Sequence, residues 1–359
     1  MRQNGDFSAL ATRLSTSGDP IGAPSSATPL TPTIFHESWW LQAVTGGACQ
    51  QVSVHSGGRE VGRLPFVHRR RLGMRECILP ELTPFLGPAV DEGRGRIVQR
   101  HHNQRQIVAE LIAQLPPHSR FHQRLHADLA DATAFRRAGF DTSVDFTFEI
   151  APAATATLWS GMRDKTRNII RRAQEQGSIY AMEPEAFCAF YRRNLSLHNK
   201  ATNYMWRHGA LPVMIAALDR DRARVIALCN ARGETQAAIV VVWDARTSYL
   251  LLTTRTPASH AGAVSLLIWD AIRQAAAAGR TFDFGGVGTS GSVLFYSGFG
   301  GDVRPRYVAH RTTRTFRAVD HAARKLRSLQ GRIALAFAPP ADLPAAGETR
   351  TLTSSLATS

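Results

Sequence analysis

Long apolar runs are absent from this sequence. The longest uninterrupted apolar segment, Ala237 to Trp243, has seven residues, whereas a helix that crosses a bilayer needs about 20. The sequence therefore predicts no transmembrane segment. The first residues, MRQNGDFSALATRLS, also lack an apolar core followed by a small-residue cleavage site, which argues against a secretory signal. We expect a cytoplasmic protein.

Cysteine is scarce, and the few cysteines are far apart. Cys49, Cys77, Cys188 and Cys229 form no C-x-x-C pair, so neither a zinc ribbon nor a disulfide framework is predicted. The adjacent His101 and His102 do not have the spacing of metal ligands. The sequence predicts no metal cofactor.

Acidic residues are few compared with basic ones. Asp and Glu number 28 against 43 Lys and Arg, which gives a net charge of +15. With 44% hydrophobic residues in 359, the chain can bury a sizeable core, and its length suggests two to three domains. The excess of positive charge predicts a surface that attracts anionic partners.

The composition divides the chain into five parts. Residues 1–33 and 338–359 are rich in small and polar residues without periodicity, and we expect both tails to be disordered. A break at Ala151-Pro152 separates a first half, 34–150, from a second half, 151–316. A basic helix is expected over 317–337.

Local patterns predict a mixed α/β fold. In the first half we expect a hairpin around Gly57-Gly58, a helix over 96–115 and strands over 121–128 and 144–150. The second half is predicted to open with three helices before any strand, the first capped by Ser160. Then follow, in order, strands over 224–230, 236–243 and 247–254, a helix over 260–278, a strand over 281–284, a short helix over 292–298 and a final strand over 307–316.

Several motifs in this order resemble a known superfamily. They are Arg167 to Ala173 with Gly177, Ala263 to Ala271 (AVSLLIWDA), Phe282-Asp-Phe-Gly285, and Phe295 with Phe299-Gly300. The second half resembles GNAT acyltransferases of the FemAB-like, cellulose-biosynthesis-type branch. The first half resembles the same branch at GRLPFVHRRRLGMR and LTPFLGPAV, so the similarity spans about 36–316. The resemblance implies two GNAT-like halves in tandem, each a mixed, largely antiparallel sheet flanked by helices.

The resemblance also implies a donor site where a strand leads into a helix. Acyl-CoA, most simply acetyl-CoA, would place its pyrophosphate on backbone amides there, because unpaired amides and the helix dipole favour an anion. In this sequence the junction contains Thr253, Thr254, Ser259, His260, Ala261, Gly262 and Ala263. Gly262 would let the backbone approach a phosphate closely. The alternative is an ordinary core helix with Ser259 as its N-cap.

Two residues are candidates for the chemistry of acyl transfer. Asp283, at a strand end beside Gly285-Gly286, could accept the proton of the attacking amine. It could equally cap the following turn. Tyr296 could protonate a leaving thiolate. Relatives often carry Lys directly after the residue that corresponds to Phe295, and the tyrosine at that position disfavours an aminoacyl-tRNA donor.

Three arginines share one face of a predicted helix. Arg163, Arg167 and Arg171 follow one another at intervals of four residues. Like charges at this spacing destabilise a helix, so Arg167 and Arg171 could hold an anionic acceptor. A solvated basic face is the alternative.

Four functions are compatible with these patterns. The first is acyl transfer from acyl-CoA to an amine or hydroxyl of a sugar or small metabolite, in envelope polysaccharide or secondary metabolism. The second is transfer from aminoacyl-tRNA. The third is nucleic-acid binding without catalysis, since residues 304–333 carry nine Lys or Arg and one Asp. The fourth is a catalytically inactive GNAT-like partner protein.

Overall fold

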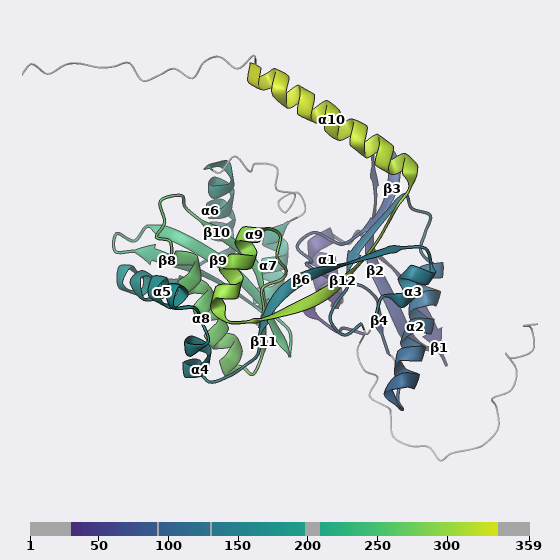
Figure 1. Cartoon of the computed structure of the whole chain (residues 1–359), viewed down its shortest axis with the longest axis horizontal. Helices are drawn as coiled ribbons and strands as arrows, with labels where there is room; N and C mark the ends of the chain where they lie inside the picture. The colour runs from purple at the N-terminus through teal and green to yellow at the C-terminus, as the bar shows by residue number, and fades with distance from the viewer. Residues whose placement is uncertain (1–29, 92, 130, 198–208, 337–359) are drawn as a thin grey trace, which may run out of the picture.

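The computed structural model describes residues 30–91, 93–129, 131–197 and 209–336, with side chains up to residue 326 in the last helix. Figure 1 shows two lobes connected by a pair of long strands, with helix α10 (Arg314–Ala336) extending away from one lobe. Most of the tails predicted for residues 1–33 and 338–359 lies outside the described residues. Within 30–33, however, Leu30 accepts hydrogen bonds from Arg63, and Thr33 is buried.

The first lobe is a sheet covered on one face by two helices. The predicted hairpin is present: β1 (Cys49–Ser56) pairs with β2 (Arg59–Arg71) across Gly57 and Gly58, which both have positive φ. The sheet continues through β3 (Met74–Ile78) and β5 (Arg120–Arg124), with the short β4 (Ala89–Val90) beside β2. Helices α2 (Ile97–Ala113) and α3 (Thr133–Arg137) cover it (Figure 1). Phe66, Phe121 and Phe135 are fully buried in the core between them.

The second lobe contains the predicted antiparallel meander. Strands β8 (Ala223–Asn230), β9 (Thr235–Trp243) and β10 (Thr247–Arg255) pair in sequence order. β7 (Gly177–Ala181) lies at one edge, and β11 (Thr281–Asp283) pairs in parallel with β10. The expectation that three helices precede any strand is therefore wrong, because β7 separates α5 (Asp164–Gln176) from α6 (Pro184–Leu197).

Helices cover both faces of the second lobe. On one face lie α8 (Ala263–Ala277) and α5, whose apolar side chains form one core with the sheet. On the other face lie α6, α7 (Ala210–Leu218) and α1 (Ser38–Thr45). The 3₁₀ turn Ile34–His36 precedes α1, and α4 (Thr155–Ser160) precedes α5. Because α1 and Phe35 come from the first half of the chain but pack on the second lobe's sheet, the two lobes share a core.

A single twelve-stranded sheet runs through both lobes. Its order is β1-β2-β3-β5-β12-β6-β11-β10-β9-β8-β7, with β4 beside β2. The connecting strands are β6 (Asp141–Ile150) and β12 (Asp302–Thr312), which run together across the middle of Figure 1. β12 lies between β5 and β6, so a strand from the end of the second half completes the sheet of the first. The predicted fold class, a mixed sheet flanked by helices, is confirmed.

No helix among the described residues is long and apolar enough to span a bilayer. No group of three or more His, Cys, Asp or Glu side chains among them is arranged to hold a metal ion.

Candidate active site

Strands β10 and β11 pair only briefly and then separate. Their parallel register covers Thr247–Tyr249 and Thr281–Asp283. β10 then continues to Arg255, and its register against β9 is interrupted between Leu250 and Leu252. After Asp283 the chain instead turns through two glycines with positive φ, Gly285 and Gly286. The separation opens a wedge between two strands of the sheet.

A cavity of about 330 Å³ occupies this wedge. One wall is Leu250 to Thr253 of β10, and the opposite wall is Phe284 to Gly286. Tyr296 from α9 (Ser290–Tyr296) and the segment Leu82 to Pro84 from the first half complete the lining. A Cβ on Gly285 would lie 3.1 Å from the carbonyl oxygen of Leu250, so glycine lets the two walls approach closely here. The cavity contains groups from both halves of the chain.

Helix α8 begins directly after β10 and presents a buried polar group at its first turn. The first helical hydrogen bond runs from the Leu266 amide to the Gly262 carbonyl, which leaves the amides of Val264 and Ser265 without an acceptor inside the helix. The Ser265 hydroxyl is completely buried, and among the described residues it has no hydrogen-bond partner. Amides and a hydroxyl of this kind can bind an anion.

Comparison with known proteins identifies the lobe that holds these features. Residues 160–292 match the acetyltransferase (GNAT) domain family. This part of the chain is a GNAT domain. The fold of the chain is similar to that of FemX: the match covers 72% of this chain and 87% of FemX, with a TM-score of 0.54 and 11% sequence identity. The expected GNAT, FemAB-like resemblance is thus confirmed.

Two further solved structures are similar at lower scores. One is the C-terminal domain of a putative lysylphosphatidylglycerol synthetase from Agrobacterium fabrum, with TM-score 0.49, 14% identity and coverage of 78% of this chain and 89% of that one. The other is a tandem GNAT protein from the clavulanic acid biosynthesis pathway, with TM-score 0.46, 13% identity and coverage of 74% and 83%. No curated protein matches the sequence significantly.

Within the GNAT domain, the predicted donor junction is only partly available. The amides of Ser259, Gly262 and Ala263 are occupied by Thr256 O, His260 Nδ1 and His260 O, respectively. Ser259 does not cap the helix, because its hydroxyl donates to Thr256 O and α8 begins at Ala263. The sequence predicted the amides of His260 and Ala261 as part of the donor junction. The amides of Val264 and Ser265 lie further along the chain and were not predicted.

Gly262 has a reason for being glycine that the sequence did not reveal. A Cβ at this position would lie 2.2 Å from the Ile169 carbonyl oxygen and 3.2 Å from the Ala173 Cβ of α5. Its φ of −89° is accessible to any residue. Gly262 is therefore required for the close packing of α5 against α8, and a large side chain there would disturb the fold.

The two predicted threonines lie on different sides of β10. Thr253 lines the wedge cavity. Thr254 is directed toward α6, where its hydroxyl accepts a hydrogen bond of 3.0 Å from the Asn194 amide. Only Thr253 is placed to contact a molecule in the cavity.

Asp283 lies directly behind the cavity wall. It is 1% exposed and does not line the cavity. One carboxylate oxygen accepts hydrogen bonds from the Thr147 hydroxyl at 2.6 Å and the Gly285 amide at 2.8 Å, and the other lies 3.2 Å from the Arg306 guanidinium. Burial raises the pKa of this carboxyl group, although its three partners oppose the shift. The geometry favours the capping alternative, in which Asp283 fixes the turn at Gly285.

Tyr296 contributes its ring to the cavity itself. The ring packs against Phe284 with centroids 4.5 Å apart. A capping box between Thr289 and Ser292 fixes the start of α9, which carries this tyrosine. Burial raises the pKa of the phenol above its ordinary value, so the hydroxyl stays protonated at neutral pH and can donate a proton.

The arginines of the predicted basic face mainly make contacts within the protein. Arg167 donates to the carbonyl oxygens of Ser160 and Met162 at 2.9 and 3.1 Å and pairs with Asp164. It thus ties the end of α4 to α5. Arg163 donates to Leu294 O and to the Ser297 hydroxyl, which connects α5 to α9. Arg171 stacks over Trp159 with its guanidinium carbon 5.5 Å from the ring centre.

The first half contributes cavity residues that the sequence did not single out as a site. Pro84 and its neighbours are held by Arg124, which donates to the Pro84 carbonyl oxygen at 2.7 Å and to Asp145. The Thr83 hydroxyl accepts a hydrogen bond from the Trp40 indole. The only sequence signal was the family-like segment LTPFLGPAV, which gave no indication that it faces the second half.

Proposed function

We propose that this protein transfers an acyl group from acyl-CoA to an amine or hydroxyl of a sugar or small metabolite. The observation that carries the proposal is the wedge between β10 and β11, which is lined by Tyr296, a group that can donate a proton. The acyltransferase class is supported by the GNAT domain at residues 160–292. The donor and acceptor are our inference.

The donor would lie along the wedge, with its pyrophosphate at the first turn of α8. The buried Ser265 hydroxyl without a partner and the amides of Val264 and Ser265 suit an anion. The pantetheine arm would follow β10, and the thioester would reach the cavity at Thr253 and Tyr296.

The chemistry requires one attack and two proton transfers. The acceptor nitrogen or oxygen attacks the thioester carbonyl carbon, and the bond between carbon and sulfur then breaks. The acceptor loses its proton to water or to an adjacent base, and the departing thiolate takes a proton from the Tyr296 hydroxyl. A phenol with a raised pKa is a suitable proton source because it is fully protonated before the reaction.

A matched pair of variants tests the donor site. Val264→Asp places a carboxylate in the first turn of α8, where it favours the helix but repels a pyrophosphate. Val293→Asp makes the same change on α9, where Val293 is 42% exposed. In isothermal titration with acetyl-CoA, we expect Val264→Asp to weaken binding at least tenfold and Val293→Asp to leave it unchanged. Equal affinities in the two variants would contradict this donor site.

An aminoacyl-tRNA donor is a second candidate, favoured by one charged cluster. Where α10 meets the sheet of the first lobe, Arg69 and Arg120 pair with the fully buried Glu76, and Arg71 and Arg324 pair with Asp320. Four arginines thus surround two carboxylates, which leaves an excess of positive charge for phosphates. If the wild type binds tRNA but not acetyl-CoA, this second candidate replaces the first.

A further inference from the structure

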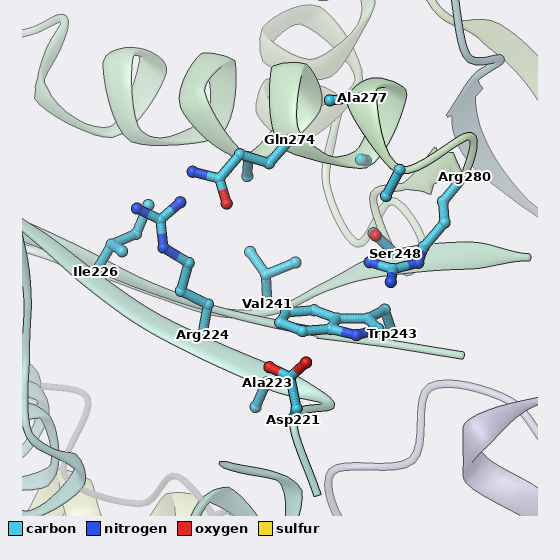
Figure 2. Close-up of a pocket in the computed structure, with 13 residues that line it drawn as sticks. Asp221, Ala223, Arg224, Ile226, Val241, Trp243, Ser248, Gln274, Ala277 and Arg280 are labelled. Carbon is cyan, nitrogen blue, oxygen red and sulfur yellow. The ribbon is translucent and has the colours of Figure 1, made fainter. Parts of the chain in front are cut away.

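A large unfilled space in the GNAT domain lies apart from the wedge cavity. It measures about 580 Å³ and is found between the last turns of α8 and the first residues of β8 and β10 (Figure 2). The wedge instead lies between the second half of β10 and the turn that follows β11. The two spaces have no lining residue in common, although both reach β10, the first at Ser248 and the wedge from Leu250 onward.

Small side chains on α8 create this space. Ala271, Ala275 and Ala278 follow one another on the helix face that covers the sheet. One methyl group at each position cannot reach the floor, where Val241 and Trp243 of β9 lie. Figure 2 shows the Trp243 ring along this floor, with open space between it and the helix. Because protein interiors are otherwise close-packed, a gap of this size suits a ligand of ordinary metabolite dimensions.

The polar groups around the space are mainly cationic. Arg280 lies over the Trp243 ring, with its guanidinium carbon 5.1 Å from the ring centre. Among the described residues, no carboxylate lies within ion-pair distance of this guanidinium, and Asp221 is the one acidic residue in the lining. Burial and the neighbouring Arg222 lower the pKa of Arg280, while the carboxylates of Asp221 and Asp244 oppose the shift.

At the opposite end, Arg224 and Gln274 approach each other across the opening (Figure 2). Both are anchored to Asp270, to which Arg224 donates at 2.8 Å and Gln274 at 2.9 Å. Asp270 also accepts from Arg273 at 2.7 Å. One carboxylate therefore serves two arginines, and the positive charge at this end is only partly balanced.

We propose that this space is a second ligand site, which takes an aromatic carboxylate. The flat ring system would lie between Trp243 and the alanine face of α8, where contact with an aromatic surface and methyl groups replaces contact with water. The carboxylate would form charge-assisted hydrogen bonds to Arg280. The site is separate from the wedge, so the proposal does not depend on the identity of the acyl donor.

Isothermal titration with 2-naphthoate tests the proposal, with quenching of tryptophan fluorescence as a second readout. We expect saturable binding to the wild type that excess acetyl-CoA does not displace. Arg280→Gln should weaken binding about tenfold or more, because it removes a hydrogen bond to a charged group. Arg273→Gln is the matched control: it removes the same charge from the same part of the chain, but Arg273 does not line the space.

A variant that fills the space provides an independent check. Ala278 is exposed at the end of α8, so Ala278→Leu should fold normally while occupying part of the ring site, and we expect it to weaken binding. Three results would overturn the proposal: no saturable binding by the wild type, equal losses in Arg280→Gln and Arg273→Gln, or displacement of 2-naphthoate by acetyl-CoA. Equal affinity for the neutral 2-naphthalenemethanol would likewise exclude a carboxylate site.

Discussion

Replacing Gly262 by alanine tests the closest helix contact of the GNAT domain. The backbone conformation at this position, φ −89° and ψ −3°, is available to alanine. Conformation alone therefore predicts stabilisation by about 0.4–1 kcal/mol, because alanine restricts the unfolded chain more than glycine does. The new methyl group would, however, lie 2.2 Å from the Ile169 carbonyl oxygen.

The size of the steric effect follows from that distance. Relieving the overlap requires α5 to move about 1 Å away from α8, and overpacking of this kind typically costs about 1–3 kcal/mol. The clash exceeds the conformational gain, so we expect Gly262→Ala to lower the free energy of unfolding by about 1–2 kcal/mol. Gly288→Ala is the control, because a Cβ at Gly288 would meet nothing within 4 Å.

Urea denaturation followed by circular dichroism measures the difference, and titration with acetyl-CoA separates it from ligand binding. We expect Gly262→Ala to shift the unfolding midpoint downward relative to Gly288→Ala. If Gly262→Ala were as stable as the wild type but failed to bind acetyl-CoA, the packing argument would be refuted, and the glycine would instead serve the approach of a phosphate.

Three further predictions concern the proton donor, the buried network and the response to acid. Tyr296→Phe should lower kcat about 10²- to 10⁴-fold with unchanged affinity for acetyl-CoA. The control Tyr307→Phe, on β12, should change neither kcat nor this affinity. Equal rates in the two variants would exclude the proton-donor role. Asp283→Asn removes one of the two negative partners of Arg306, the other being Glu149, and should lower the free energy of unfolding by about 1–3 kcal/mol. A loss of kcat with full stability would instead restore Asp283 as a candidate base. Burial lowers the pKa values of His36 and His126 in the folded protein. Because the unfolded chain then binds more protons than the folded one, the free energy of unfolding should fall as the pH drops below about 6.5. An unchanged urea midpoint between pH 7 and 5 would contradict this.

Local signals in the sequence were sufficient for most elements but not for their boundaries. The meander and the Gly57-Gly58 hairpin were predictable because alternation and turn residues act over a few positions. Ser160 and Ser259 were predicted as N-caps, but their hydroxyls donate to the nearby carbonyl oxygens of Thr157 and Thr256. A serine hydroxyl can accept a hydrogen bond from a helix amide or donate one to a nearby carbonyl oxygen, and the residue type alone does not decide between the two.

Features that depend on distant partners were not predictable. β7 consists of five residues, Gly177–Ala181, and pairs with β8 about fifty positions later, so no local periodicity marks it. In the same way, the spacing of Arg167 allowed either a ligand for an anionic acceptor or a solvated basic face. Its actual partners at the end of α4 are known only from the folded structure. That Leu82 to Pro84 line the wedge could also be known only from the folded structure.

The position of β12 affects the order in which the chain can fold during synthesis. β5 and β6 are made by residue 150, but the strand that pairs with both, β12, ends at Thr312. At about 5–20 residues per second, the ribosome needs roughly 8–30 s to make the residues between them. Over that interval β5 and β6 each have an unpaired edge, which is a template for association with other chains. We therefore expect chains truncated before residue 302 to aggregate during expression, and intact chains to depend on chaperones until their last strand emerges.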